Sequence, residues 1–383
     1  MKATLVVKSR FQFFHLARQL EKKGLLNEIY SGYPKSKLKD ELGIPKDKIK
    51  TFPYVITPYM GRRKFGLSKY EWLNNLWEYK TSTTLDNHVT SRIKEPGYLI
   101  SMSGSGLNCG KKMQSLGGKH ICQRGSTHII YQNDILADEY DRWGFKWKGI
   151  NPKIKDYVTS EYEQADKITV PSEYALQSFI KMGIPEEKMM KIPYGGRLDR
   201  FYKKSTPDTD VFRLLWVGGI SLRKGFMYAL EAFQKFKHPN KEFIVIGVMS
   251  HELKSLLNGQ NLDNVVFKGT VPNATLIDYY NSATAFVMPS IEDGFGIVLS
   301  EALASGCPVI ATPNSGSVDL FEDGKEGFIV PIRDSKALTL SFEKLTDNPD
   351  LREQMGIMGQ RRVASLGGWD EFGDHFETLI KSL

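Results

Sequence analysis

The stretch that decides the fold is residues 289–316, PSIEDGFGIVLSEALASGCPVIATPNSG. An apolar run, Ala285–Met288, precedes it, and its glycine-rich loop leads into helix-forming residues, Ile297–Ser305. A second apolar run, Val309–Thr312, follows a short turn. This order predicts a strand, a loop, a helix and a second strand, the βαβ unit of a parallel sheet covered by helices. Such sheets bind ligands outside the carboxyl ends of their strands, so the loop is a candidate site.

The same alternation extends toward the N-terminus. It predicts strands at Leu214–Val217, Phe243–Ile246 and Val265–Phe267, with helices at Phe226–Phe236, Glu252–Leu257 and Leu276–Ser282. The first half repeats it less regularly, with strands expected at Thr4–Val7, Tyr98–Met102, His120–Gln123 and Lys167–Val170 and a long helix around Tyr70–Ile93. A chain of 383 residues accommodates two such domains.

We therefore predict an α/β protein with two Rossmann-like domains, residues 1–200 and 201–368, facing across a cleft and joined near Pro193–Asp208. A final helix, 369–383, carries one apolar face made of Trp369, Phe372, Phe376, Leu379 and Ile380. We assign this helix to the first domain; the alternative is that it packs on the second.

Charge is divided unevenly between the two halves. The chain carries a net charge of +8, yet residues 1–200 hold 34 Lys+Arg against 21 Asp+Glu, and residues 201–383 hold 18 against 23. The three cysteines are scattered, which predicts neither a disulfide framework nor a zinc site. Neither a membrane-spanning run nor a secretory leader is expected. The expected location is the cytoplasm, including the inner face of the membrane.

Asp293 lies in the loop within residues 289–316 and Glu301 lies on the predicted helix that follows, with seven residues between them. Both can accept hydrogen bonds from sugar or ribose hydroxyls. Gly294 and Gly296 allow backbone N–H groups to approach a ligand closely, and the helix that follows favours an anion or a hydroxyl cluster. Taken alone, the pair is more commonly a turn-capping aspartate and a solvated glutamate.

The whole segment resembles the donor-binding signature of the family 4 retaining glycosyltransferases of the GT-B fold, in which two acidic residues bracket a Gly-Phe-Gly loop. The resemblance covers residues 165–383 well and the first 165 loosely. It implies that Asp293 or the preceding Glu292 holds hydroxyls of the donor sugar and that Glu301 holds the ribose. The loop of Gly294, Phe295, Gly296 and Ile297 would then lie against the sugar and diphosphate. The family more usually has glutamate where this chain has Asp293.

A second candidate site follows an earlier strand. Gly218 and Gly219 end that strand, and Arg223 and Lys224 precede a helix. Two cations beside a glycine turn suit a diphosphate, although a solvated basic turn is the commoner case. The resemblance implies that this pair stabilises the departing diphosphate, so no metal cofactor is expected to be essential. The Asp-x-Asp sequence at 208–210 lies in the linker and is not expected to bind a metal.

Among the histidines of the first half, His128 is the candidate site residue. Ser126 is predicted to cap a helix over Thr127–Trp143, which places His128 in the first turn, where the helix dipole lowers its pKa. The resemblance implies a histidine near the donor sugar at about this point; the alternative is a local capping histidine. The predicted catalytic residues are thus His128, Asp293, Arg223 and Lys224, whereas His120 is expected to be structural.

The acceptor side is expected on the first domain. Many relatives carry Gly-Gly after the first strand, whereas this chain has the loop Ser9–His15 without glycine, so Arg10 and His15 become acceptor candidates. Gly104, in the Ser103–Gly106 loop, and Arg124 are the other candidates. The simpler alternatives are an exposed helix start and a tight strand–helix turn.

Positive charge is densest between Lys35 and Lys64. This segment has nine Lys or Arg (35, 37, 39, 46, 48, 50, 62, 63 and 64) against Asp40, Glu41 and Asp47, with interleaved Phe52, Tyr54, Tyr59 and nearby Phe65, Trp72 and Trp77. Such a mixture suits an anionic membrane surface or a charged glycolipid; the alternative is a solvated face. No nucleic acid-binding signature is present, so no nucleic acid partner is expected.

The resulting expectation is a glycosyltransferase that moves a sugar from a UDP- or GDP-sugar to an acceptor hydroxyl with retention, in cell-surface polysaccharide or glycolipid synthesis. The resemblance favours front-face attack with the leaving phosphate as proton acceptor. Two alternatives remain: a GT-B-like epimerase or phosphorylase, and a catalytically silent nucleotide-sugar-binding subunit.

Overall fold

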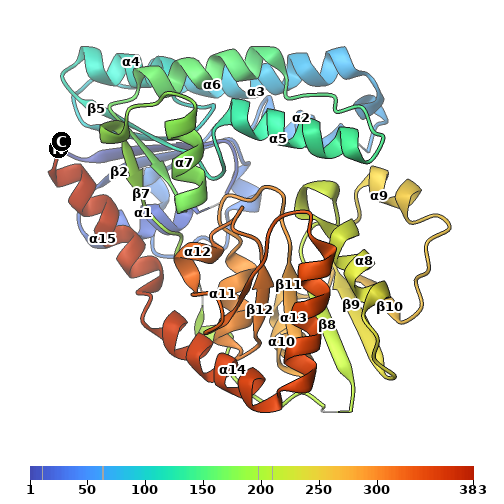
Figure 1. Ribbon diagram of the computed structural model, residues 1–383. Coiled ribbons are helices and arrows are strands. Elements are labelled where there is room, and N and C mark those ends of the chain that lie inside the picture. The colour runs from blue at the N-terminus through green and yellow to red at the C-terminus, as the bar shows by residue number, and fades with distance from the viewer. Residues whose placement is uncertain (11, 63, 197, 209) are drawn as a thin grey trace.

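The computed structural model describes residues 1–10, 12–62, 64–196, 198–208 and 210–383, arranged as two α/β domains (Figure 1). The first sheet has the order β3-β2-β1-β4-β5-β6-β7 and the second has the order β10-β9-β8-β11-β12-β13. Neighbouring strands are parallel throughout both sheets. The prediction of two Rossmann-like α/β domains is confirmed.

The strands of the first sheet are β1 Ala3–Val7, β2 Leu26–Ser31, β3 Ile49–Thr51, β4 Tyr98–Met102, β5 Lys119–Gln123, β6 Lys167–Val170 and β7 Met189–Lys191. Those of the second are β8 Phe212–Val217, β9 Lys241–Ile246, β10 Val265–Gly269, β11 Ala285–Met288, β12 Val309–Ala311 and β13 Gly327–Ile329.

The helices of the first half are α1 Phe13–Lys22, α2 Ile56–Gly61, α3 Glu71–Thr90, α4 Leu107–Ser115, α5 Ile129–Arg142, α6 Pro152–Gln164 and α7 Glu173–Lys181. Those of the second half are α8 Phe226–Lys235, α9 His251–Leu256, α10 Leu276–Ser282, α11 Ile297–Ala304, α12 Ser317–Leu320, α13 Ser335–Asp347, α14 Pro349–Ala364 and α15 Gly368–Lys381. No helix among the described residues combines the length and the apolar character needed to cross a bilayer.

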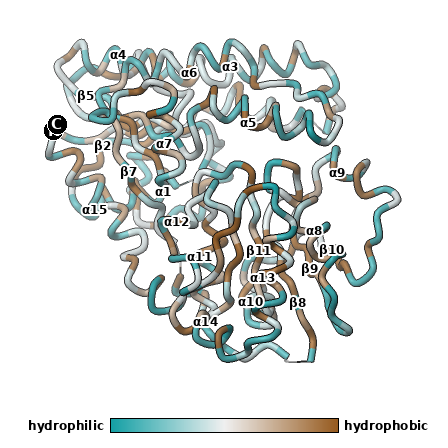
Figure 2. Tube along the Cα trace, in the orientation of Figure 1, coloured by the Kyte–Doolittle hydropathy of each residue, from teal (hydrophilic) through white to brown (hydrophobic). Residues whose placement is uncertain are grey.

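Four strands were not predicted: β2, β3, β7 and β13. The central strands were recognisable because every residue of β1, β11 and β12 is buried, which selects an unbroken apolar run. By contrast, β3 and β7 are three-residue edge strands without a buried residue. Figure 2 shows the corresponding pattern, with hydrophobic segments along the inner strands of the second domain and hydrophilic ones on outer helices.

The last helix, α15, crosses back to the first domain and packs on α1, which brings the two chain ends together (Figure 1). Lys22 pairs with Asp370 at 3.0 Å and Lys23 with Glu377 at 2.7 Å. A Cβ on Gly373 would lie 2.5 Å from the Cβ of Gln19, so only glycine permits this close approach.

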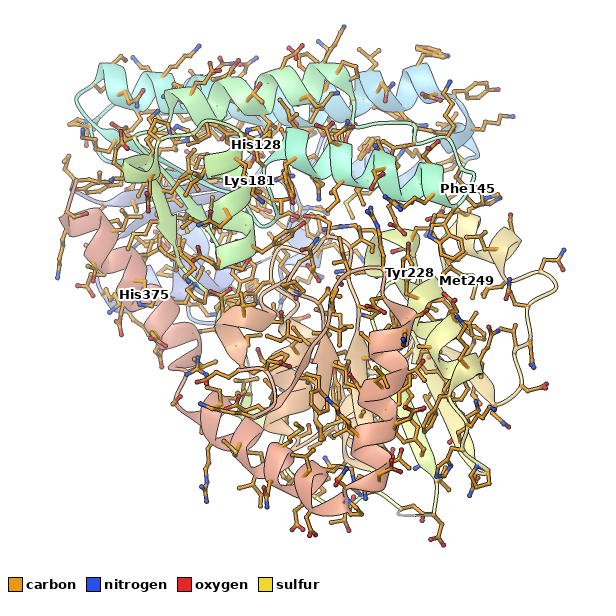
Figure 3. All side chains as sticks on the ribbon, viewed as in Figure 1. His128, Phe145, Lys181, Tyr228, Met249 and His375 are labelled. Carbon is orange, nitrogen blue, oxygen red and sulfur yellow. The ribbon has the colours of Figure 1, made fainter. Side chains whose placement is uncertain are left out.

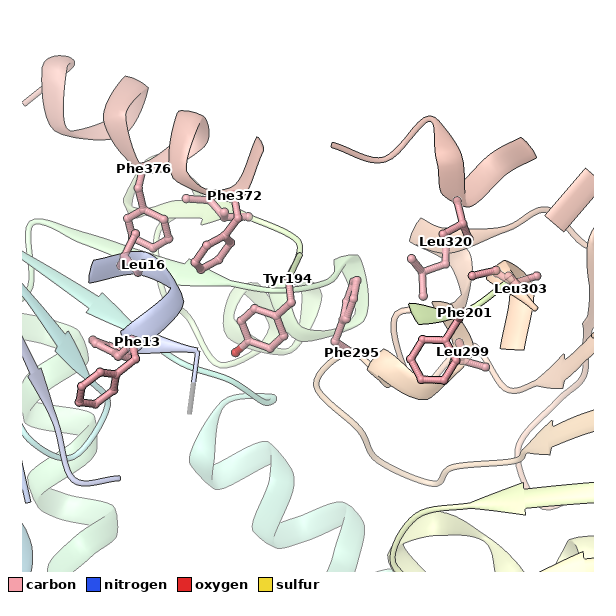
Figure 4. Close-up of a cluster of buried hydrophobic side chains, with 14 of the residues drawn as sticks. Phe13, Leu16, Tyr194, Phe201, Phe295, Leu299, Leu303, Leu320, Phe372 and Phe376 are labelled. Atoms are coloured by element: carbon pink, nitrogen blue, oxygen red, sulfur yellow. The ribbon is translucent and has the colours of Figure 1, made fainter. Parts of the chain in front are cut away.

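A continuous apolar cluster joins the two domains on the linker side (Figure 4). Phe372 and Phe376 of α15 lie over α1, and Tyr194 of the linker stands between α1 and Phe295 of the second domain, with its ring centroid 5.7 Å from that of Phe295. The domains are therefore fixed to each other by packed side chains as well as by the chain itself.

Candidate active site

The pocket of the second domain lies where the strand order of its sheet reverses. Strands β8 and β11 are neighbours, but the chain runs outward from β8 to β10 on one side and from β11 to β13 on the other. The loops that follow such a pair of strands separate and leave a crevice. A pocket of about 280 Å³ occupies it, lined by Gly125, Tyr194, Trp216, Val217, Gly218, Gly219, Lys224, Val287, Met288, Asp293, Phe295, Gly296, Ile297 and Val298.

Lys224 and Asp293 form an ion pair in this pocket. Lys224 ends a 3-10 turn, Leu222–Lys224, and Gly225 follows with φ of +73°. A Cβ on Gly225 would lie 2.0 Å from the carbonyl oxygen of Pro289, so glycine allows the β8 loop to lie against the β11 loop. This contact is what brings a cation from one loop to a carboxylate on the other.

Glu292, the neighbouring carboxylate, is fully buried and does not line the pocket. Its Oε1 accepts hydrogen bonds from the hydroxyls of Ser126 at 2.6 Å and Thr127 at 2.7 Å, and its Oε2 accepts one from Gln132 at 2.9 Å. Burial alone would raise the pKa of Glu292, but Arg223 and these hydrogen bonds outweigh it and lower the pKa to about 2. Glu292 is thus a charged link between the domains.

Arg223 belongs to the same link. Its Nε donates to Oε2 of Glu292 at 2.7 Å and to the Glu292 carbonyl at 3.1 Å, and its Nη2 donates to Ser126 at 3.3 Å. The structure therefore separates the two predicted cations: Lys224 lines the pocket, and Arg223 joins the turn to the loop and to the first domain. Likewise, of the two predicted acidic residues, Asp293 is at the pocket and Glu292 is not.

The glycine loop brings the domains into backbone contact. A Cβ on Gly294 would lie 2.0 Å from the carbonyl oxygen of Gly125, and the hydroxyl of Ser172 donates to the Gly294 carbonyl at 2.7 Å. Gly296, with φ of +81°, then starts α11. The loop therefore presents one side to the pocket and the other to the first domain.

Glu301 lies farther along α11. Its Oε2 accepts a hydrogen bond from the Tyr280 hydroxyl at 3.0 Å, and it is not part of the pocket lining. Burial raises the pKa of Glu301 to about 7, although the Tyr280 hydrogen bond acts in the opposite direction. Its carboxyl group therefore changes charge near neutral pH.

Comparison with known protein families identifies the half of the chain that carries this pocket. Residues 199–362 match the family described as glycosyl transferases group 1. This half of the chain is therefore similar to the group 1 glycosyl transferases.

Curated relatives carry related names. The capsular polysaccharide biosynthesis glycosyltransferase CapM of Staphylococcus aureus is 31% identical over 237 residues, which cover 58% of this chain and 59% of CapM. The putative colanic acid biosynthesis glycosyltransferase WcaL of Salmonella typhimurium is 28% identical over 248 residues, which cover 60% of this chain and 61% of WcaL. The chain thus spans less than two thirds of the length of these two relatives.

Solved structures resemble the whole chain. Sucrose-phosphate synthase from Thermosynechococcus elongatus has a TM-score of 0.74 at 17% identity, with 100% of this chain and 98% of that chain covered. Anabaena HepE in complex with UDP has a TM-score of 0.68 at 16% identity, with 100% of both chains covered. The likeness shows the fold, and the predicted GT-B architecture is confirmed.

His128 lies away from the pocket and is not part of its lining. It is the N-cap residue of α5, with Nδ1 accepting from the Ile130 N–H at 3.3 Å, so the prediction of Ser126 as the cap is wrong. The Ser126 hydroxyl instead donates a hydrogen bond to Glu292. His128 is 3% exposed, and its ring packs on Tyr162 and Phe179 inside the first domain. Burial, with a smaller effect of Arg124, lowers the pKa of His128 to about 4.

The four predicted acceptor residues do not gather in one place. Arg10 pairs with Glu41, and His15 stacks on Trp369 at 4.0 Å; both line a groove of about 1140 Å³ beside α1 and the start of α15. Phe11, in the same loop, lies outside the described residues, as does Thr209 of the Asp-x-Asp sequence in the linker.

Gly104 and Arg124 form hydrogen bonds within the first domain. The Gly104 N–H donates to the buried carboxylate of Glu161 at 2.6 Å, and Gly104 has φ of +85°. Arg124 donates to the Thr127 carbonyl at 3.1 Å and to Gln132 at 2.8 Å, which fixes the loop whose Gly125 lines the pocket.

The far end of α5 makes a second link between the domains. Glu139, fully buried, accepts hydrogen bonds from Arg333 Nε at 2.7 Å, Tyr228 at 2.9 Å and Trp143 at 2.8 Å. Phe145 packs with Met249 against the core of the second domain, and Figure 3 labels Phe145, Tyr228 and Met249 around this contact. Helix α5 thus contacts the second domain at both ends.

Seven lining residues were not predicted: Gly125, Tyr194, Trp216, Val217, Val287, Met288 and Val298. The last five belong to β8, β11 and α11, next to the predicted loops. Gly125 and Tyr194 lie outside the second domain, and Tyr194 reaches the pocket from the linker, where its hydroxyl accepts a hydrogen bond from Gln12 at 3.1 Å. Their only signal was their position in the chain: Gly125 directly follows the candidate Arg124, and Tyr194 lies in the predicted linker. Among the described residues, no group of three or more His, Cys, Asp or Glu is placed to hold a metal ion.

Proposed function

We propose that the protein is a glycosyltransferase that moves a sugar from a nucleotide-sugar to an acceptor hydroxyl in cell-surface polysaccharide or glycolipid synthesis. The observation that carries this proposal is the pairing of Lys224 with Asp293 between two glycine loops in a pocket of about 280 Å³. A cation suits a diphosphate, and a carboxylate suits sugar hydroxyls. The names of CapM and WcaL, and the UDP bound to HepE, support the proposal.

The donor would separate the Lys224–Asp293 pair. The diphosphate accepts hydrogen bonds from Lys224 Nζ, while sugar hydroxyls donate to the Asp293 carboxylate. As the bond between the anomeric carbon and the phosphate oxygen breaks, Lys224 stabilises the negative charge that develops on the diphosphate. In this mechanism no metal ion is required, and Arg223 acts by positioning the turn, because Glu292 holds its guanidinium.

We propose that the reaction retains the anomeric configuration. The acceptor oxygen forms a bond to the anomeric carbon on the face that the diphosphate leaves, and the acceptor proton passes to the departing phosphate oxygen. The resemblance to retaining glycosyltransferases supports this course. The burial of His128 agrees with it, because a residue that is 3% exposed is poorly placed to act as a general base.

The test begins with calorimetric titration of the full chain with UDP and with GDP. Nucleotide release from the matching sugar donors is then measured with and without acceptor glycans, and NMR of the product reports the anomeric configuration. Lys224→Ala should lower turnover at least about a hundredfold, the order expected for loss of one preorganised charge. The matched control, Lys235→Ala, removes an exposed cation on α8 that pairs with Glu231.

Three results would count against this function. Absence of binding to either nucleotide rejects the donor site. Binding without turnover identifies the silent subunit, and recovery of an epimerised nucleotide-sugar or a sugar phosphate identifies the epimerase or phosphorylase. Activity that disappears with a chelator rejects the metal-free mechanism.

We also propose that the protein works in the cytoplasm at the inner membrane face, on a glycan or glycolipid acceptor. The basic segment at residues 35–64 supports this proposal.

A further inference from the structure

Large apolar side chains are exposed on one part of the first domain. They are Tyr54, Met60, Phe65, Tyr70, Trp72 and Leu76, all within residues 54–76, which we call the aromatic surface. Phe65 is 78% exposed, Tyr54 75% and Trp72 68%. Single exposed apolar residues are normal, but a concentration of them along one segment marks an interaction site.

Most of the described residues of the aromatic surface belong to helices and turns. This surface comprises α2, the 3-10 turn Leu67–Lys69 and the start of α3. The Nε of Arg62 donates to Asn74 Oδ1 at 2.9 Å, which ties the turn to α3, and its guanidinium lies 3.6 Å from the centroid of the Tyr59 ring.

The first half of α3 extends beyond the core of the domain. The buried residues of this helix begin at Thr81, so its first ten residues, Glu71–Lys80, contribute none. Trp72 and Leu76 are four residues apart, and both are exposed. Residues with this spacing lie on the same side of a helix, so the two side chains form one outward-facing apolar stripe.

The charge around this surface is mainly positive. Residues 54–76 carry Arg62, Arg63, Lys64 and Lys69 against one acidic residue, Glu71, which pairs with Lys148 at 3.6 Å. Lys64 and Lys69 are exposed, and Arg63 lies outside the described residues.

Farther back in the basic segment, two of the cations are neutralised within the domain. Lys48 pairs with Glu21 at 2.6 Å and Lys50 with Glu28 at 3.3 Å. The structure therefore moves the centre of the basic, aromatic region from residues 35–64 to residues 54–76.

We infer that residues 54–76 dock on an anionic lipid bilayer, with the aromatic side chains in the headgroup layer and Lys64 and Lys69 beside lipid phosphates. Amphipathic aromatic rings favour that layer, and exposed cations are attracted to its negative potential. Protein–protein interfaces are depleted of lysine, whereas Lys64 and Lys69 lie among these exposed aromatic residues. This inference rests on the proposed function only in supposing that the membrane carries the acceptor; docking itself needs no donor.

The test is sedimentation of the full chain with vesicles of phosphatidylcholine alone or mixed with phosphatidylglycerol. We expect binding only to the anionic vesicles at about 0.1 M salt, weakening as salt rises. Phe65→Ser/Trp72→Ser should weaken partitioning at least about tenfold, because two large apolar groups no longer leave water. Lys64→Ser/Lys69→Ser should weaken it by about tenfold or more.

Matched controls distinguish binding by this surface from nonspecific adsorption to vesicles. Tyr202→Ser/Leu340→Ser removes exposed apolar residues elsewhere, and Lys35→Ser/Lys37→Ser removes charge from the other part of the basic segment. Both controls should bind like the wild type.

Several outcomes would overturn the inference: equal binding to neutral and anionic vesicles, wild-type binding by the Phe65/Trp72 variant, equal loss in the controls, or a dimer in light scattering that the Phe65/Trp72 variant abolishes. Nucleotide release is measured on the same samples without vesicles. Activity without vesicle binding rejects the docking surface alone, and vesicle binding without nucleotide release rejects the enzyme function alone.

Discussion

Replacing Glu292 with glutamine tests whether this carboxylate links the two domains. In the wild type it accepts hydrogen bonds from Ser126, Thr127 and Gln132 of the first domain and pairs with Arg223 of the second. Glutamine keeps the shape and one acceptor oxygen, but its amide group faces donors that then have no acceptor. The buried guanidinium also loses its counter-charge.

The expected loss of stability follows from the pKa of Glu292. Lowering it from 4.5 to about 2 corresponds to about 3 kcal/mol of folding free energy. Breaking a buried ion pair by removing one partner costs about 3–5 kcal/mol, which agrees with the value obtained from the pKa of Glu292. Because the folded-state pKa is depressed, this stabilisation is complete above about pH 4.5 and disappears as the pH falls toward 2.

The assay is urea unfolding of the wild type and Glu292→Gln at pH 7 and at successively lower pH, followed by tryptophan fluorescence. We expect a difference of about 3 kcal/mol at pH 7 that narrows below pH 4.5. Glu322→Gln is the control, since this exposed glutamate pairs only with Lys325 three residues away. A difference below about 0.5 kcal/mol at pH 7, or one that is constant with pH, would refute the reasoning.

Three further predictions concern the same cleft. Gly294→Ala should lower turnover about a hundredfold, because the new Cβ would lie 2.0 Å from the Gly125 carbonyl oxygen and force the loops apart; Gly61→Ala, with its nearest neighbour at 3.8 Å, should be neutral in the same turnover and melting assays. If Glu301 binds the ribose as a carboxylate, nucleotide affinity measured by calorimetry should rise as the pH rises through about 7. Tyr280→Phe should move the midpoint of this rise to higher pH, because the Tyr280 hydrogen bond lowers the pKa of Glu301. Glu301→Gln should remove the pH dependence, and an unchanged profile in this variant would show that another group titrates. Glu139→Gln should lower the free energy of unfolding in urea by about 3 kcal/mol, because Arg333 loses its buried partner. A wild-type unfolding midpoint would show that the ion pair of Arg333 with Asp138 is enough to keep this stability.

The loops around the pocket of the second domain were predictable from local sequence. The unbroken apolar runs of β11 and β12 and the glycines around Asp293 identify a βαβ unit without knowledge of any distant contact. Lys224 followed from the same logic, because it comes directly after a strand and a glycine turn. These features depend on residues close together in the chain, which is where sequence patterns carry most information.

The roles of Glu292, Arg223 and Ser126 depended on distant contacts. Glu292 meets Ser126, 166 positions away, and Arg223, 69 positions away, so its burial follows from the way the domains face each other. Ser126 has the residue type of a helix cap, yet a buried carboxylate offers it a stronger, charge-assisted partner, and His128 takes the cap.

The return of α15 to α1 has a consequence for synthesis of the chain. The side of α1 that α15 covers is made early, whereas its cover, Gly368–Lys381, emerges after the whole second domain. At about 5–20 residues per second, that interval lasts about 20–70 s. Throughout it the nascent first domain exposes an apolar strip to the cytosol, so a chaperone that shields such strips should raise the yield of folded protein, and truncation before residue 368 should leave a protein prone to aggregation.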